Sequence, residues 1–310
     1  MRPVIACAAG ALAVFAAACK PDLDERESRI DAPRIVAIVG EPPEAKPNAP
    51  VTYTAVVASP AGPVEGAPIA WALCATPKLL TENGTVSPEC VRDGVRPVAD
   101  PPPVGPVVTA TTLADACALF GPDAPPGDFR PRDPDATGGY YQPLRASWGS
   151  RTAFVRERIS CNLANASADV TLEFNHRYVA NRNPRLGPLS ARVAGEPRAL
   201  DRLPAGRDVE LTVTWPAEDA ESYVALDPAT QSIAPRREAM RVSWYATAGS
   251  FESDRTGRTD AELDTFTNNV WSNGPAPASG PVHVWLVLRD SRGGSTYATY
   301  TLSTVTEGAP

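Results

Sequence analysis

The sequence predicts a mainly β protein with two sandwich-like domains, and three observations lead to this fold class. The chain contains 34 prolines and few helix-favouring runs, which is typical of short strands joined by turns. Its second half alternates apolar and polar residues over several short runs. Its 310 residues are enough for two domains of the usual size, about 150 residues each.

The charge balance argues against one broad class of function. The net charge is −7, and the basic residues form no cluster along the chain. A protein that binds nucleic acid generally presents a basic patch to the phosphates. We therefore expect no nucleic-acid partner.

Residues 1–18 have the pattern of an export signal. Arg2 supplies a positive charge, an apolar run extends from Val4 to Phe15, and small alanines lead up to Cys19. The apolar run is too short to span a bilayer as a stable helix. We therefore expect this segment to be a signal peptide that is removed.

The stretch Ala16–Cys19 resembles the lipobox of bacterial lipoproteins, in which small residues precede a cysteine that becomes the lipidated first residue. It departs from that motif at Ala16, where leucine is usual. The resemblance implies an acylated, palmitate-bearing Cys19, and Lys20 in place of aspartate implies the outer membrane, on its periplasmic or its surface side. The alternative is ordinary cleavage that leaves a free thiol on Cys19.

The number of cysteines supports lipidation. Five cysteines remain once the signal is removed, an odd number for an exported chain. A lipid on Cys19 leaves four, enough for two disulfides in an oxidising compartment. No Cys-x-x-Cys spacing occurs among them, so we expect no zinc. Of the three possible pairings we favour Cys74–Cys90, which closes a short loop, together with Cys117–Cys161.

Residues 19–32 are expected to form a flexible tether, because they are polar and show no apolar periodicity. The first β-rich domain is predicted over residues 33–183. Its strands are expected at 34–39, 51–57, 69–74 and 153–161.

Between about 75 and 150 the alternation stops and prolines are frequent, which indicates an insertion pinned by the disulfides. One short helix is predicted there, with Thr112–Asp115 as a capping box and Gly121 as its stop. Asp133–Gly138 imitates the start of a calcium loop but lacks the glutamate at the twelfth position, so we interpret it as a turn without metal. The run Asp169–Tyr178 stays open between a strand, from its alternation, and a helix with Ser167 as N-cap.

The second domain, residues 184–307, shows the clearest alternation, with strands predicted at 209–215, 242–247, 282–289 and 295–305. Trp244 and the turn Asp290–Gly294 resemble the inward tryptophan and the last hairpin of immunoglobulin-like modules of bacterial surface proteins. This resemblance implies two immunoglobulin-like β-sandwich domains, the first with the proline-rich insertion and the short helix. Residues 133–143 and 243–249 also resemble uncharacterised lipoproteins of Gram-negative bacteria with GC-rich genomes, a family that implies no activity.

One sheet of the second domain is expected to carry aromatic side chains on its outer face. If Val242 and Val284 face the core, parity places Tyr245, His283 and Trp285 on the opposite face, where Tyr297 would join them. Such a face would stack on sugar rings or receive another protein. The alternative, which we favour, is that the first domain or the connection 216–240 covers it.

No pattern of residues points to catalysis. His176 and His283 lie in different domains, and no nucleophile–base pair is visible. The acidic residues of the second domain, such as Glu218, Asp219 and Glu221, are most simply solvated loop charges. The sequence therefore predicts a lipid-anchored, non-enzymatic envelope protein for binding, adhesion or scaffolding, without a cofactor, whose partners are the membrane and an envelope protein or glycan. The alternative is an envelope hydrolase that acts on carbohydrate through paired carboxylates.

Overall fold

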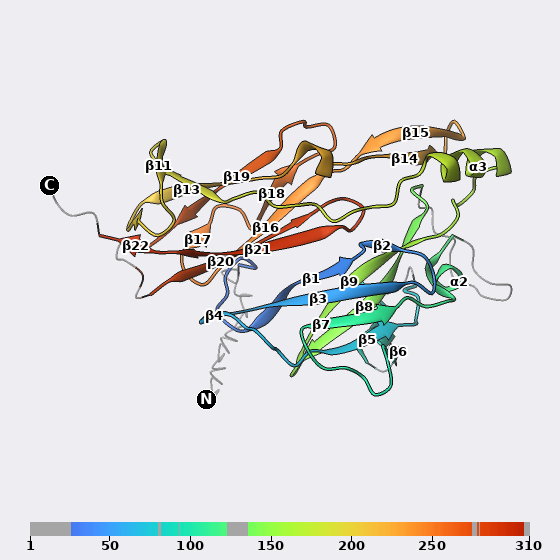
Figure 1. The fold of residues 1–310 in the computed structure, drawn as a ribbon, viewed down its shortest axis with the longest axis horizontal. Helices are drawn as coiled ribbons and strands as arrows, with labels where there is room; N and C mark the ends of the chain where they lie inside the picture. The colour runs from blue at the N-terminus through green and yellow to red at the C-terminus, as the bar shows by residue number, and fades with distance from the viewer. Residues whose placement is uncertain are drawn as a thin grey trace, which may run out of the picture.

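The computed structural model describes residues 26–79, 82–92, 94–122, 136–274, 278 and 280–306. In this part of the chain the fold is mainly β, and two immunoglobulin-like sandwiches lie against each other (Figure 1). The predicted fold class is confirmed. The signal peptide, the lipid attachment at Cys19 and the acidic start of the turn at Asp133 lie outside the described residues. No described helix is both long enough and apolar enough to cross a bilayer.

The first sandwich packs a sheet of β1, β3, β4 and β7 on a sheet with the order β2-β9-β8-β5-β6. The strands of the first sheet are β1 (Arg34–Glu41), β3 (Pro50–Ser59), β4 (Gly62–Pro63) and β7 (Val107–Thr111). Those of the second are β2 (Glu44–Ala45), β5 (Ala70–Cys74), β6 (Val95–Pro97), β8 (Gly139–Trp148) and β9 (Arg151–Ser160). Alternating residues of these strands bury a core that contains Tyr53, Ile69, Trp71 and Leu144.

The proline-rich region contributes strands to this sandwich, which differs from the predicted insertion over about 75–150. β7 pairs with β3, and β8 lies between β5 and β9 within its sheet. Leu144 and Ala146 of β8 are fully buried. The frequent prolines concealed this strand, although Tyr140, Gln142, Leu144 and Ala146 are all buried at every second position.

Two disulfides fasten the connections of this sandwich, with the pairings favoured from the sequence. Cys74 of β5 is joined to Cys90 of α1 (Pro88–Val91), with the Cα atoms 5.3 Å apart. Cys117 of α2 (Ala116–Phe120) is joined to Cys161, directly after β9, with the Cα atoms 5.8 Å apart. Each bond therefore links a short helix to a strand of the sheet.

The predicted capping box at the start of α2 is wrong. The Thr112 hydroxyl donates instead to the carbonyl of Lys46, at 2.8 Å, and ties the loop after β2 to the end of β7. The helix begins at Ala116, four residues beyond Thr112, and the side chain of its N-cap residue Asp115 makes no capping bond. Gly121 ends it, as predicted.

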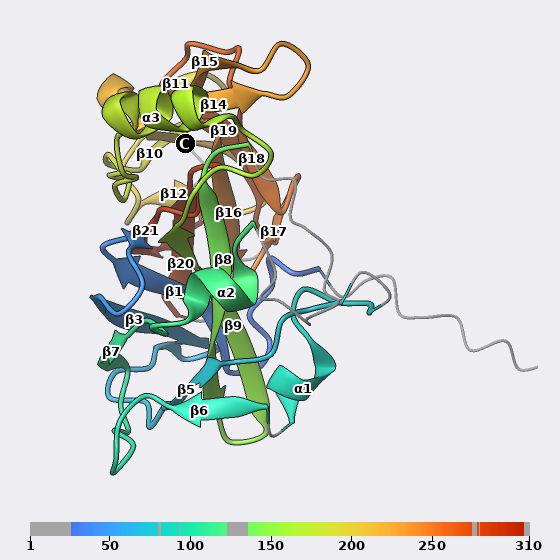
Figure 2. The ribbon, with the colours of Figure 1, turned by 90° about the vertical axis from the view of Figure 1, so that its right-hand side faces the viewer.

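The run left open between strand and helix is a helix, α3 (Ala168–Arg177). The Ser167 hydroxyl accepts from the Val170 amide as an N-cap, and Phe174 is buried. Figure 2 shows α3 beside a hairpin of β14 (Ser222–Asp227) and β15 (Ser232–Arg237), where Phe174 packs with Val224 and Leu226. The helix thus lies on residues of the second domain.

The second sandwich packs the sheet β11-β10-β13-β19-β17 on the sheet β18-β16-β20-β21. The strands of the first sheet are β10 (Ser190–Val193), β11 (Glu196–Arg198), β13 (Asp208–Thr214), β17 (Ser250–Phe251) and β19 (Phe266–Ser272). Those of the second are β16 (Met240–Ala246), β18 (Arg255–Arg258), β20 (Val282–Arg289) and β21 (Ser295–Leu302). The pair β12 (Leu203–Pro204) and β22 (Thr304–Val305) and the short turn η1 (Ala217–Asp219) complete the described elements. Trp244 and Trp271 are fully buried between the sheets.

The expected tether over residues 19–32 differs from the structure at its C-terminal end. Ile30 is buried, and its amide donates to the Ala246 carbonyl at 2.9 Å. The Ala246 amide donates in turn to the Ser28 carbonyl at 2.8 Å. The buried Ile30 and these two backbone hydrogen bonds to β16 hold this short polar stretch in place. A single apolar residue produces no periodic pattern in the sequence.

Candidate functional site

The aromatic face predicted for ligand binding is the junction between the two sandwiches. Trp285 is 0% exposed, because it packs among apolar side chains of the first domain. The residues that cover it are Ile30, Val36, Ala37, Val56 and Ala58. A ligand face at Trp285 is therefore wrong, and the covering partner is the first domain.

The other members of the predicted face lie at the margin of the same junction. His283 packs so closely on Gly62 of β4 that a Cβ there would stand 2.8 Å from its Nε2 atom. The Arg34 guanidinium lies 5.5 Å from the ring centroid of the half-buried Tyr245. Tyr297 stays 40% exposed. The four residues therefore do not form one open surface.

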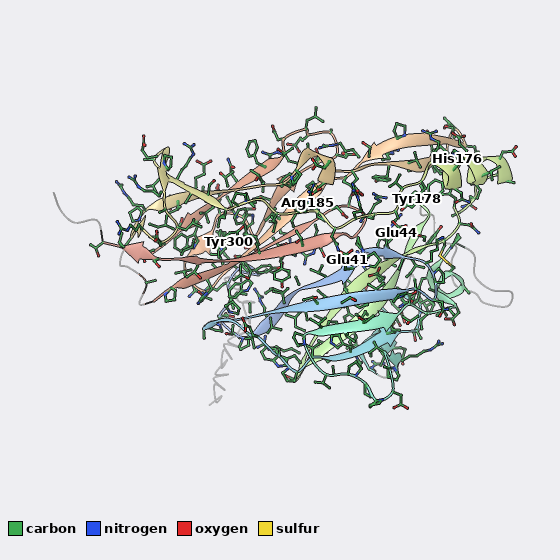
Figure 3. The ribbon with its side chains drawn as sticks, in the orientation of Figure 1. Glu41, Glu44, His176, Tyr178, Arg185 and Tyr300 are labelled. Atoms are coloured by element: carbon green, nitrogen blue, oxygen red, sulfur yellow. A yellow bond between two sulfur atoms is a disulfide. The ribbon has the colours of Figure 1, made fainter. Side chains whose placement is uncertain are left out.

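A buried ion pair extends the junction on its polar side. Glu44 and Arg158 have side chains that are each 1% exposed, with 3.3 Å between Oε2 and Nε. The Tyr178 hydroxyl and the Asn181 backbone amide donate to the same carboxylate, at 2.7 Å and 2.9 Å from Oε2. Figure 3 labels Glu44 and Tyr178 near each other between the two sandwiches. Burial by itself would raise the pKa of Glu44, but Arg158 and these hydrogen bonds hold it below its ordinary value. Glu44 is therefore a charged group, fully satisfied, at the point where the domains meet.

Arg292 builds a second buried cluster beside the first. Its guanidinium forms ion pairs with Glu238 and, at 2.9 Å, with Glu221. It also donates to the Tyr178 hydroxyl at 3.3 Å, so Tyr178 touches both clusters. Burial raises the pKa of Tyr178 to about 12, which keeps its hydroxyl protonated as a donor to Glu44.

Two acids expected to be solvated loop charges belong to this region. Asp219 and Glu221 are only 8% exposed. Arg185 pairs with Asp219 at 2.8 Å, and Arg182 pairs with Glu221 at 2.5 Å. Glu218 stays exposed, as expected. Both acids lie in a loop, and the arginines that pair with them come from a segment more than 30 residues earlier, so their pairing follows only from the fold.

Asp290 shapes the turn between β20 and β21. Its Oδ1 accepts from the backbone amides of Arg292, Gly293 and Gly294 at 2.8–3.0 Å, and its carboxylate also accepts from the Asn181 side chain. Burial and the nearby Glu238 raise the pKa of Asp290 to about 7. These contacts are those of a turn-forming residue and use most of its acceptor capacity.

Glu157 is a buried acid inside the first sandwich. Burial raises its pKa to about 8, and the charges of Glu44 and Glu41 add to the rise. Gly40 makes room for it, because a Cβ at that position would stand 2.7 Å from Glu157 Oε2. At neutral pH this side chain is therefore mostly a neutral acid next to the Tyr53 ring.

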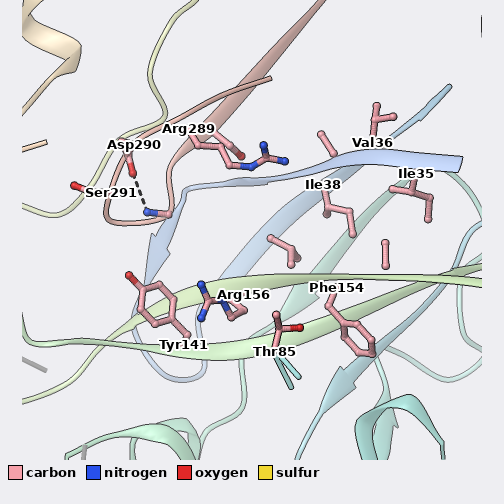
Figure 4. A pocket seen from close by; sticks show the side chains of 15 residues that line it. Ile35, Val36, Ile38, Thr85, Tyr141, Phe154, Arg156, Arg289, Asp290 and Ser291 are labelled. Atoms are coloured by element: carbon pink, nitrogen blue, oxygen red, sulfur yellow. Dashed lines mark hydrogen bonds between the residues drawn. The ribbon is translucent and has the colours of Figure 1, made fainter. Parts of the chain in front are cut away.

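An open crevice, the β1–β9 crevice, lies next to the junction and has a volume of about 420 Å³ (Figure 4). Its long walls are residues 35–38 of β1 and 153–156 of β9, and the turn after β20 closes one end. Arg156 and Arg289 reach into it together with Tyr141. No sequence pattern indicated this crevice, because two strand edges form a crevice only when the sheets stack.

The crevice lacks the arrangement that sugar hydrolysis requires. Asp290 is the one carboxylate among the described residues that line it, whereas a glycosidase needs a facing pair. His176 lies exposed on α3 and His283 at the junction, so the structure does not bring the histidines together. Within the described ranges, no group of three or more metal-ligating side chains is assembled.

Comparisons with known proteins match no family model and no curated protein. Among solved structures, the chain is similar to a lipoprotein from Bacteroides thetaiotaomicron, with 13% identity, a TM-score of 0.22, and coverage of 39% of this chain and 83% of that one. It is also similar to the adhesin InvE of Yersinia pseudotuberculosis, with 13% identity, a TM-score of 0.21, and coverage of 86% and 58%. Domains 4 and 5 of the S-layer protein SbsC match at 9% identity with a TM-score of 0.20, over 90% and 100%. These scores are too low to support an argument about function.

Proposed function

We propose that the chain is a lipid-anchored, non-enzymatic protein of the bacterial cell envelope that serves as a binding or scaffold module. The observation that supports this most is the junction, which buries Trp285 on one side and fully paired charges on the other. Interfaces between domains of one chain are usually small and mobile. We expect a junction with a buried apolar side and a buried ionic side to restrict such motion, which suits a protein that positions a surface at a fixed place near its anchor.

The anchor is tested by the chemistry of Cys19. Mass spectrometry of the processed chain should find a diacylglyceryl thioether on Cys19, and labelled palmitate should be incorporated. Cys19→Ser should abolish the label and release the protein from the membrane fraction. Cys7→Ser is the matched control, because this cysteine lies in the predicted signal and its loss should change nothing. An unmodified Cys19 thiol would contradict the anchor.

The binding role is tested in intact envelopes. Chemical crosslinking followed by purification should capture an envelope protein or glycan with the wild-type chain. Trp285→Ala is the informative variant, because it loosens the rigid junction without touching the exposed surfaces. Capture of neighbouring lipid alone by the wild type would contradict a binding or scaffold role.

A further inference from the structure

The β1–β9 crevice exposes one edge of a long strand. Among the described residues, positions 151–157 of β9 pair with β8 on one side, and β2 joins the other side only at Arg158 and Ile159. β1 runs nearby, but its ladder is formed with β3. The outer edge of β9 therefore presents backbone N–H and C=O groups to the crevice without a ladder partner in the described chain.

The opposite edge of the same sheet is protected, and this edge is not. β6 has 3 residues and ends in Pro97, whereas β9 has 10 residues. Short edge strands and proline are ordinary means of preventing the addition of a further strand. The long edge of β9 keeps neither protection, so it is a template for an extended peptide.

Each long wall of the crevice is four residues long, so the crevice can hold an extended segment of about four residues, or roughly 13 Å of strand. Ile35 and Val155 lie at the margin of the first core and are half-buried, so apolar side chains of a guest would extend that core. Burial of apolar surface of this kind would add to the backbone hydrogen bonds.

The charged groups in the crevice favour an acidic guest. Arg156 lies over the Tyr141 ring, 5.2 Å from its centroid, and Arg289 donates to Ser243 Oγ at 3.2 Å. Neither arginine takes part in an ion pair formed by the described residues. Asp290 lines the same crevice, but among the described ion pairs it is joined to neither arginine, and its Oδ1 accepts from three amides of its own turn. Arg289 is half-buried, whereas Arg156 is exposed. A half-buried guanidinium without a carboxylate is costly, and a carboxylate of a guest would offset that cost at Arg289 while Arg156 adds attraction from the open side.

We propose that the β1–β9 crevice binds an extended peptide segment with an acidic side chain, which adds to β9 as a further strand and places its carboxylate between Arg156 and Arg289. This inference deepens the proposed binding role and depends on it, but it does not depend on the lipid anchor. The partner it implies is a protein with an exposed, extended, acidic terminus or loop.

The test uses the full chain in detergent micelles and a fluorescent nine-residue peptide of alternating valine and threonine with a central aspartate. Binding should be measurable by polarisation, and replacement of the central aspartate by asparagine should weaken it about tenfold or more, as expected for a charge-assisted hydrogen bond. N-methylation of every second backbone nitrogen should abolish binding in one register and spare it in the other, because only one edge of an added strand bonds to β9. Hydrogen exchange of β9 amides between 152 and 156 should slow in the complex.

Arginine variants separate the contribution of the two charged side chains to peptide binding from that of the backbone edge of β9. Arg156→Gln, which changes an exposed side chain, and Arg289→Gln should each reduce the preference for aspartate over asparagine. Arg151→Gln is the matched control, because Arg151 lies on β9 but outside the crevice lining, and the preference should stay unchanged. Melting temperatures of all three variants identify any loss of fold.

Four results would overturn the proposal. They are no binding of the aspartate peptide to the wild type, equal loss with either register of N-methylation, an aspartate preference that survives both arginine variants, and dimerisation of the chain through β9 in place of peptide binding. If the peptide does not bind but Cys19 carries a lipid, the crevice proposal fails and the anchor stands. If the peptide binds but Cys19 is unmodified, the anchor fails and the crevice proposal stands.

Discussion

The junction between the sandwiches has an apolar half around Trp285 and an ionic half around Tyr178, and the two halves act differently. Burial of Trp285 is non-directional and stabilises in proportion to the apolar area removed from water. The ionic half gains little net stability, because desolvation offsets most of the attraction between its charges. It requires each partner to be in place, as the shared hydroxyl of Tyr178 shows. The apolar half therefore holds the domains together, and the ionic half fixes their orientation.

Loss of Arg292 should be the most damaging change to the ionic half. Arg292→Ala leaves Glu221 and Glu238 buried without their cation, and removal of one partner of a buried pair costs about 3–5 kcal/mol. We expect the upper end of this range in the free energy of unfolding from urea titration. Arg177→Ala, which removes an exposed pair with Glu173, is the control and should cost about 0.5 kcal/mol or less. A similar small cost for both variants would contradict the distinction between the halves.

The apolar half should respond nearly as strongly but without dependence on charge. Trp285→Ala creates a cavity at the junction and should cost about 3–4 kcal/mol. Tyr297→Ala on the neighbouring strand removes a side chain that is 40% exposed, and it should cost about 1 kcal/mol or less. Differential scanning calorimetry at low and high pH provides the test. A Trp285 effect that changes markedly with pH would show that the two halves are coupled.

The sequence predicted the apolar half better than the ionic half for a physical reason. Alternation along a strand assigns side chains to faces, and parity correctly placed Tyr245, His283 and Trp285 on the side away from the core of their own domain. Charge pairing depends on which segments meet in space, so Glu221 looked like a solvated loop residue until Arg182 and Arg292 came beside it. Arg158 carried no signal of burial, because the charged Arg156 and Glu157 directly precede it in the same strand.

Glu157 and Glu44 are both buried, but only Glu44 has a cationic partner among the described ion pairs. The pKa of Glu157 in the folded chain is about 8, above the ordinary value of 4.5, so the folded state holds a proton that the unfolded state releases. The protonated Glu157 therefore stabilises the fold fully below about pH 4.5. This contribution to the free energy of unfolding is lost as the pH rises towards 8, by at most roughly 1.4 kcal/mol per pH unit. Glu157→Gln should therefore flatten the decline in melting temperature between pH 5 and pH 8. An unchanged profile would contradict a protonated Glu157.

The smallest predicted effect tests the margin of the apolar half, where β4 contacts β20. Gly62 has φ +117° and lies against His283, with Nε2 2.8 Å from a Cβ added at Gly62. Gly66 has φ +65° and no atom within 4 Å of its added Cβ. Gly66→Ala therefore reports only the conformational cost of placing alanine in the left-handed region. Gly66→Ala should lower stability by about 1 kcal/mol, the usual cost of a left-handed residue. Gly62→Ala should cost at least about 1 kcal/mol more than that, because φ +117° lies outside the left-handed well and because His283 must also move. His283→Ala in the Gly62→Ala background should recover part of that excess, whereas the same substitution with Gly66→Ala should not. Equal costs for the two glycines would mean that the contact between β4 and His283 contributes nothing to the position of the domains, and that Trp285 alone defines this half of the junction.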